Sequence, residues 1–224
     1  MENTARVIHP EFAAGRRILA VSDIHGNLPF FRGLLQTVRF TPEDILVLDG
    51  DMLEKGRDSL ALLREIMELS RTHTVYPICG NCDGLVSNFF ETDRLDERFF
   101  ASYLPQHPES IIRQLADEMG YVDWRDFPGL RAALRERYPE IRAWLAGLPT
   151  ILETEHLVFV HGGVPSLEHM ETLDRWKCMK NDDFRGQGHS FSKYVIVGHW
   201  PVTLYNPKVP SAAPLFDYDR KIIS

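Results

Sequence analysis

The sequence has no apolar run long enough to cross a membrane, and residues 1–14 mix charge with proline instead of forming a secretory core. Only three cysteines occur in 224 residues, an odd number that makes no disulfide framework. Positive charge is not in excess either, because the formal net charge is −7. These absences predict a cytoplasmic protein that binds neither nucleic acid nor a membrane.

The signatures of several enzyme classes are also missing. The chain shows no Ser-His-Asp order, no Gly-x-Ser-x-Gly elbow and no glycine-rich phosphate loop followed by lysine. Its composition, with 44% hydrophobic and 25% charged residues, is ordinary for a globular protein with a substantial core. We therefore expect one α/β domain over residues 1–224.

Polar residues follow several apolar runs directly. The run Ile45–Leu48 does not alternate, which predicts a strand buried on both faces, and it leads into Asp49-Gly50-Asp51. Open α/β proteins place their sites at such strand ends. A polar turn would explain any single case, but packing hardly explains five. The others are Asp23-Ile24-His25 after Ile18–Val21, Asn81 after Val75–Ile78, His161 after Leu157–Val160, and His199 after Val195–Val197.

These residue types are typical metal ligands. Asp23 and His25 are two residues apart, so on extended backbone both side chains can grip one ion. Carboxylate oxygen combined with imidazole favours Mn, Fe or Zn over Ca. The full set exceeds one zinc shell and suits two divalent or trivalent ions sharing Asp51. The set is Asp23, His25, Asp51, Asn81, His161 and His199.

Other segments give weaker expectations. Residues 84–147 break the strand rhythm with helical stretches near 109–119, 129–137 and 139–146, and predict a helical insertion that walls the site. A helix after Asn27 should bury Phe30, Phe31, Leu34, Leu35 and Val38. A second helical stretch, Leu167–Met179, carries Arg175, which is either on a solvated basic face or a phosphate contact.

Cys79 and Cys82 have the spacing of a redox pair. That function would need a helix opening directly beneath them, as in thioredoxin-like proteins. A zinc knuckle would need a second pair nearby, and Cys178 is isolated. A redox protein therefore stays as an alternative from another class.

At this point the motifs resemble a known family. Asp23-x-His25, Gly50-Asp51, Gly80-Asn81, His161-Gly162-Gly163 and Gly198-His199 are similar in order and spacing to the calcineurin-like metallophosphoesterases, over residues 17–201. The resemblance implies a four-layer αββα sandwich and a dinuclear centre. It assigns Asp23, His25 and Asp51 to the first ion. It assigns Asp51, Asn81, His161 and His199 to the second.

The sequence pattern resembles one branch of that family in particular. His161-Gly162-Gly163 and Pro201 resemble the phosphoprotein-phosphatase branch, and Gly198-His199-Trp200 resembles its bacterial dinucleoside tetraphosphate hydrolases. The branch usually has arginine, a phosphate ligand, where this chain has Lys55. It also has a general-acid histidine where this chain has Cys82, followed here by the carboxylate of Asp83.

The resemblance implies hydrolysis of phosphate esters or anhydrides by a metal-bridging hydroxide. Asp51, Asn81, Cys82 and Asp83 are the candidate catalytic residues, and Lys55 and Arg175 the candidate phosphate contacts. The expected substrate is a phosphorylated small molecule, nucleotide or phosphopeptide. Dinucleoside polyphosphate hydrolysis and cyclic phosphodiesterase activity are the enzymatic alternatives. A degenerate metal-binding protein that uses this surface for a partner is the non-enzymatic one.

Overall fold

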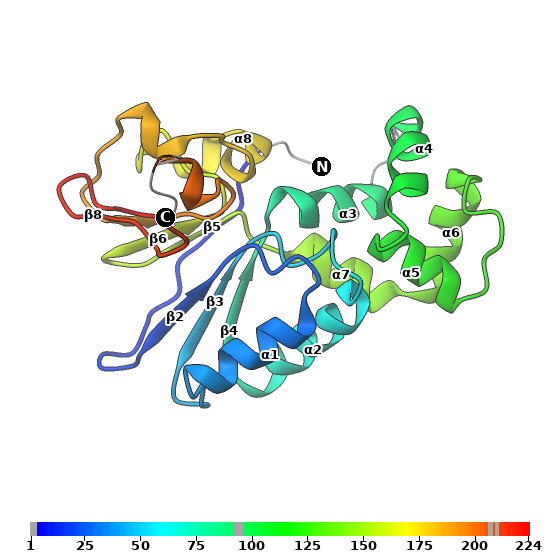
Figure 1. The fold of residues 1–224 in the computed structure, drawn as a ribbon, viewed down its shortest axis with the longest axis horizontal. Coiled ribbons are helices and arrows are strands. Elements are labelled where there is room, and N and C mark those ends of the chain that lie inside the picture. The colour runs from blue at the N-terminus through cyan, green and yellow to red at the C-terminus, as the bar shows by residue number, and fades with distance from the viewer. Residues whose placement is uncertain (1–3, 92–95, 206–207, 209–210) are drawn as a thin grey trace.

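Two sheets face each other at the centre of the protein (Figure 1). The computed structural model describes residues 4–91, 96–205, 208 and 211–224. The first sheet is parallel, in the order β2 (Ile18–Val21), β3 (Ile45–Asp49), β4 (Thr74–Ile78). The second has the order β1 (Val7–Ile8), β5 (Ile151–Glu153), β6 (Leu157–Val160), β7 (Tyr194–Ile196), β9 (Ile222–Ile223), β8 (Phe216–Asp217).

β3 lies in the middle of the first sheet and is buried along its whole length, as its unbroken apolar run predicts. Its side chains alternate between two cores. Ile45 and Val47 pack against the second sheet, whereas Leu46 and Leu48 pack on the opposite face with the helices. This two-sided burial fixes the strand's position, so the residues that follow it are held firmly.

Helices cover the outer faces of both sheets and complete four layers. On the first sheet lie α1 (Leu28–Thr37) and α2 (Ser59–Thr72), coloured blue and cyan in Figure 1. On the second lie α8 (Arg175–Met179) and the short 3₁₀ segments Met170–Thr172 and Phe184–Gln187, and another such segment is Val202–Leu204. The predicted α/β class with an αββα arrangement is confirmed.

Two details of the helix predictions are wrong. Phe30 of α1 is 76% exposed and Leu34 is 38% exposed, because the buried face of this helix is centred on Leu28 and Phe31. The stretch 167–179 is not one helix either. It breaks at Leu173, which is extended, and restarts where the side chain of Asp174 caps α8 by accepting from the Lys177 N–H.

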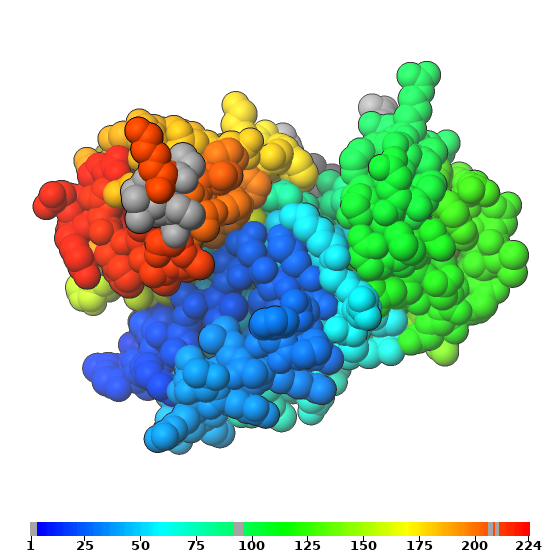
Figure 2. All heavy atoms as spheres, in the orientation of Figure 1, coloured from blue at the N-terminus to red at the C-terminus, as the bar shows by residue number. Residues whose placement is uncertain are grey.

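Between β4 and β5 the chain is helical. It forms α3 (Asn81–Glu91), α4 (Glu97–Gln106), α5 (Ile111–Glu118), α6 (Phe127–Arg137) and α7 (Pro139–Gly147). These helices extend to one side of the sheets in Figure 1. Figure 2 shows the surface hollowed between α4, in green, and the segment around α8, in yellow. No helix among the described residues is long and apolar enough to cross a membrane.

Glu54 fastens these helices to the loop that follows β3. Its carboxylate is fully buried and accepts hydrogen bonds from Tyr103 Oη at 2.6 Å, Ser110 Oγ at 3.1 Å and Ile111 N at 2.9 Å. Burial raises the pKa of Glu54, while these donors oppose the rise. These three hydrogen bonds form a latch that fixes the backbone of Glu54, the residue directly before Lys55.

The latch predicts a graded loss of stability. Tyr103→Phe removes one buried hydrogen bond and should lower the free energy of unfolding by about 1–3 kcal/mol, and Glu54→Ala should cost more because three donors lose their acceptor. Urea denaturation measures both. The control is Tyr121→Phe, whose hydroxyl bonds Asp126 at an exposed site and should cost less than about 0.5 kcal/mol. Equal losses for the two tyrosine variants would contradict the latch.

The hydrogen bonds of Asp44 should make a pH-dependent contribution to stability. Its carboxylate accepts from Arg17 Nε at 2.9 Å and from Thr41 N at 2.8 Å, and the Arg17 hydrogen bonds hold the pKa of Asp44 well below its ordinary value. A lowered folded-state pKa stabilises the fold above the unfolded pKa, about 3.9, and this stability is lost as the pH falls through the folded pKa. Asp44→Asn should therefore destabilise the protein near neutral pH, by an amount that shrinks below about pH 4.

Denaturation of both proteins across this pH range measures the difference. Asp219→Asn, at an exposed carboxylate, is the control and should leave the curve unchanged. A difference for Asp44→Asn that stays constant down to the lowest pH at which the protein folds would contradict the assignment.

Candidate metal centre

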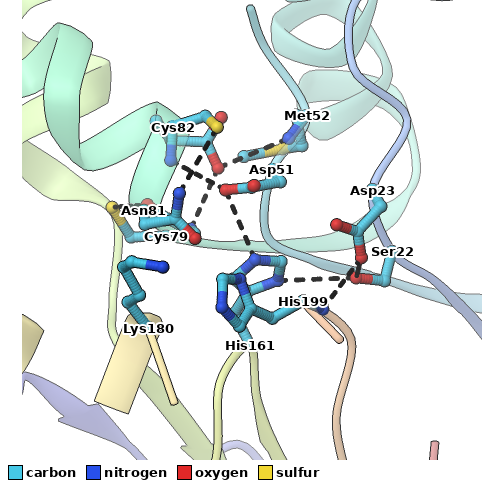
Figure 3. A network of polar contacts seen from close by, with 12 residues as sticks. Ser22, Asp23, Asp51, Met52, Cys79, Asn81, Cys82, His161, Lys180 and His199 are labelled. Atoms are coloured by element: carbon cyan, nitrogen blue, oxygen red, sulfur yellow. Dashed lines mark hydrogen bonds and ion pairs between the residues drawn. The ribbon is translucent and has the colours of Figure 1, made fainter. Parts of the chain in front are cut away.

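The polar ends of the strands converge on one point between the two sheets (Figure 3). Their backbones are hydrogen-bonded to one another, with Asp23 N donating to Gly50 O at 3.1 Å and His25 N donating to Asp51 O at 3.0 Å. Gly198 N donates to His161 O at 3.0 Å and joins the second sheet's loops in the same way. These hydrogen bonds hold the loops of each sheet next to one another.

Asp51 lies at the centre of the cluster and is 1% exposed. Its Oδ1 accepts from Cys82 N at 2.8 Å and lies 3.3 Å from His161 Nε2. Its Oδ2 lies 3.8 Å from His25 Nε2 on the other side. One carboxylate therefore presents its two oxygens to two separate groups of donors.

The first group surrounds His25. The Nε2 of this histidine is 3.6 Å from Asp23 Oδ1, and donor atoms of His25, Asp51 and Cys82 all lie within 4.8 Å of one another. The second oxygen of Asp23 accepts from Ser22 Oγ at 2.5 Å and from His199 N at 3.0 Å. Asp23 is thus held in place by one oxygen while the other faces His25.

The second group contains His161 and His199, whose donor atoms lie within 4.8 Å of one another and of Asp51. His161 is fully buried, with Nδ1 2.7 Å from the Asp49 carbonyl oxygen. The other ring nitrogen, Nε2, faces Asp51 but forms no hydrogen bond with the described residues. Burial alone would lower the pKa of His161, but the adjacent Asp51 raises it to about 9. A metal ion bound at this nitrogen would take the place of the proton.

His199 and Asn81 complete this group. His199 Nε2 is 2.8 Å from Asp182 Oδ1, which leaves the other ring nitrogen for a metal, in the arrangement by which carboxylates orient metal-binding histidines. The Asn81 side chain donates from Nδ2 to Cys82 Sγ at 3.4 Å. Its Oδ1 is buried without a hydrogen-bond partner in the described residues. Such an oxygen needs a ligand, and a cation supplies one.

The backbone is strained at four of these six residues. Asp23, His25, Asp51 and His199 have φ values of 55°, 48°, 49° and 60°. Residues with a Cβ seldom adopt positive φ, and such outliers concentrate at functional sites where the surroundings hold them in place.

Gly50 and Gly80 permit the close approach of the loops. Gly50 has φ 82°, and a Cβ there would lie 2.6 Å from the His161 ring. A Cβ at Gly80 would collide with Asp51. Both positions therefore need glycine for steric reasons.

Cys82 and Asp83 occupy different surroundings. Cys82 is 8% exposed at the edge of the first donor group, and burial together with Asp51 raises the pKa of its thiol. The Asp83 carboxylate is turned inward and accepts from Leu53 N and Gly80 N, both at 3.0 Å. Burial raises the pKa of Asp83 to about 7. Asp83 thus ties two ligand loops together.

Asp49 is a further buried carboxylate beneath the cluster. Neither of its oxygens has a hydrogen-bond partner in the described residues, and burial raises the pKa of Asp49 to about 7. Its backbone carbonyl orients His161, as described above.

Cys82 lies in the first turn of α3 and Cys79 lies two residues before the helix, so the helix that a redox pair would need is present. Cys79 is nevertheless fully buried, and burial raises the pKa of its thiol to about 12. A redox pair needs a reactive thiolate at its first cysteine, and a thiol with such a pKa forms little of it, which disfavours the redox alternative.

The candidate phosphate contacts differ in position. Lys55 is exposed and its Nζ lies 3.1 Å from His25 Nε2, within reach of the first donor group. Arg175 is half-buried and directs Nη2 at Cys79 Sγ, 3.3 Å away, so it supports the loop that carries Asn81. Its solvated-face interpretation therefore fits Lys177 better than Arg175. The phosphate role of both Lys55 and Arg175 stays a prediction.

Two residues next to the donor groups, Glu54 and Asp182, were not anticipated. Nothing local in the sequence links Asp182 to His199. Asp182 Oδ1 lies 3.2 Å from Lys180 Nζ as well as 2.8 Å from His199. Figure 3 shows the Lys180 side chain extending toward Asn81.

The residues present fit two metal ions. Two groups of oxygen and nitrogen donors share one carboxylate, and the Asn81 oxygen and His161 Nε2 are buried without hydrogen-bond partners in the part of the chain that is described. Carboxylate, amide and imidazole donors suit Mn, Fe and Zn.

Several known proteins are similar to this chain in sequence. The profile of the calcineurin-like phosphoesterase family matches residues 16–223. A symmetrical bis(5′-nucleosyl)-tetraphosphatase of Pectobacterium atrosepticum is 42% identical over 64 residues, which are 28% of this chain and 22% of that protein. The corresponding enzyme of Aggregatibacter actinomycetemcomitans is 46% identical over 50 residues, which are 22% of this chain and 18% of that protein. The matches thus span about a fifth of these relatives.

Solved structures share the fold at low identity. A protein provisionally assigned as a diadenosine tetraphosphatase has a TM-score of 0.56 and 18% identity, covering 98% of this chain and 86% of that one. A serine/threonine phosphatase from Saccharomyces cerevisiae has a TM-score of 0.56 and 12% identity, covering 99% and 70%. The family profile spans nearly the whole chain, and the chain belongs to the calcineurin-like phosphoesterase family.

Proposed function

We propose that this chain hydrolyses phosphate esters or anhydrides with two metal ions that share Asp51. The observation that carries the proposal is the orientation of this buried carboxylate, with Oδ1 toward His161 and Oδ2 toward His25. Asp23 and His25 would hold the first ion, and Asn81, His161 and His199 the second. Bound there, the ions would supply Lewis acidity that activates water and offsets the charge of the phosphoryl group.

The protein's own residues position the substrate around this centre. Lys55 is a flexible exposed cation beside His25, and it would contact phosphoryl oxygens as a point charge. Asp83 would keep the Asp51 and Asn81 loops in register, since it bonds the backbone of both. We regard residues 84–147 as an insertion within one domain, with α4 forming a wall of the hollow in Figure 2.

The substrate class is proposed from chemistry and from the relatives. The matched curated proteins are named for nucleoside tetraphosphate hydrolysis, which favours a dinucleoside polyphosphate, whose bonds are anhydrides, among the possible substrates. Phosphopeptides and other phosphorylated small molecules remain in the class. A panel of phosphopeptide, mononucleotide, dinucleoside tetraphosphate and cyclic diester, each with a metal-free control, tests the proposal. No metal-dependent turnover of any of them would favour the non-enzymatic alternative.

The proposed centre predicts the metal content of the protein. Wild type should bind two transition ions per chain. Asp51→Asn should weaken both, because the carboxylate faces both donor groups, whereas His25→Ala should weaken mainly one. Elemental analysis after equilibration with limiting metal measures the stoichiometry. His9→Ala, at a side chain that is 67% exposed and pairs with Glu153, is the control and should bind two ions. One ion in fully loaded wild type would refute the dinuclear centre.

The proposed mechanism also predicts how turnover depends on the leaving group. A general acid needs a pKa near the working pH. Burial and Asp51 raise the pKa of the Cys82 thiol, so this residue should not protonate a departing alkoxide. Aryl phosphates and anhydrides, which have good leaving groups, should react well and alkyl phosphates poorly. Cys82→His should raise alkyl phosphate turnover more than aryl phosphate turnover.

A plot of kcat/KM against leaving-group pKa for both proteins measures this effect. The control is Cys79→Ser, which should leave the slope unchanged. Cys178→His would not serve as a control, because Cys178 is buried in a different hydrophobic core. A shallow wild-type slope that Cys82→His does not alter would show that another group supplies the proton.

A further inference from the structure

We infer that Cys82 is a thiolate ligand of the first metal ion, which makes the centre a mixed oxygen, nitrogen and sulfur site that prefers zinc. The inference rests on the proposed dinuclear function and adds a ligand to it. Its starting point is the cluster of donor atoms from His25, Asp51 and Cys82, all within 4.8 Å of one another. Ligand atoms around one tetrahedral ion, about 2.0–2.3 Å from it, lie this close together.

The backbone holds Cys82 in that position. Cys82 N donates to Asp51 Oδ1 at 2.8 Å, so the residue is tied directly to the shared carboxylate. It also lies in the first turn of α3, which begins at Asn81. The thiolate would therefore sit at the positive end of an eleven-residue helix, where negative charge is stabilised.

Asn81 gives an independent indication. Its amide donates from Nδ2 to Cys82 Sγ at 3.4 Å, so the sulfur already acts as an acceptor. The same orientation leaves Asn81 Oδ1 buried without a partner in the described residues and free for the second ion. One amide would then serve both ions, as a direct ligand to the second and as a hydrogen-bond donor to the sulfur ligand of the first. Such donors orient and tune metal ligands.

Binding of a metal ion by Cys82 requires no oxidant. The Sγ–H bond of Cys82 breaks, its proton passes to solvent, and a sulfur lone pair forms the bond to the ion. Thiolate is a softer donor than carboxylate and selects zinc over manganese. The other two cysteines do not compete, because Cys79 faces Arg175 and Cys178 packs in the core beneath the second sheet.

Cobalt(II) substitution tests the inference on the protein itself. We expect wild type loaded with cobalt to show a near-ultraviolet thiolate-to-cobalt charge-transfer band, and Cys82→Ser to lose it. Cys79→Ser is the matched control and should keep the band, because the sulfur that it removes lies outside the donor cluster. The ratio of zinc to manganese affinity should fall at least about ten-fold in Cys82→Ser, since even an outer-shell partner is worth that much.

The wild-type protein alone also decides the question if Cys82→Ser does not fold. X-ray absorption of the zinc-loaded wild type should show a sulfur scatterer at about 2.3 Å. Two bound cobalt ions without a charge-transfer band, or a zinc shell of oxygen and nitrogen only, would overturn the thiolate inference and leave the proposed function intact. Failure of wild type to bind two ions would instead refute the proposed function.

Discussion

The arrangement of this site depends on the burial of one carboxylate, Asp51. Asp51 is 1% exposed, and it stays ionised there because burial, which favours the neutral acid, is outweighed by His161 and the Cys82 N–H, so that its pKa is lowered. Each of its oxygens faces a different group of donors. Without this residue, both donor groups would lose the carboxylate that they share.

The fold delivers this carboxylate by ordinary means. β3 is packed on both faces, which fixes where it ends, and glycines at 50 and 80 allow the loops to approach within contact distance. The cost is a strained backbone at four candidate ligand residues, which hydrogen bonds between the loops offset. The helices after β4 are joined to the loop after β3 through Glu54, which accepts hydrogen bonds from Tyr103 and Ile111.

The departures from the family pattern are chemically related. Lys55 and Cys82 both lie beside the first donor group. The proposed lack of a general acid at Cys82 suits substrates with good leaving groups. The nucleoside tetraphosphatases that this chain partly matches act on such bonds, which agrees with the proposed preference for anhydrides.

The sequence alone determined the strands and the set of candidate ligands. An apolar run that ends in Asp, Asn or His indicates a buried strand followed by a candidate ligand. Asp51 and His161 could therefore be identified as candidate ligands from the local pattern. Tertiary structure alone decided the rest, because Asp182 is seventeen residues from His199 and Glu54 is about fifty from Tyr103 along the chain. The direction of Arg175 and the exposure of Phe30 were likewise set by packing between distant elements, which a one-dimensional period does not encode.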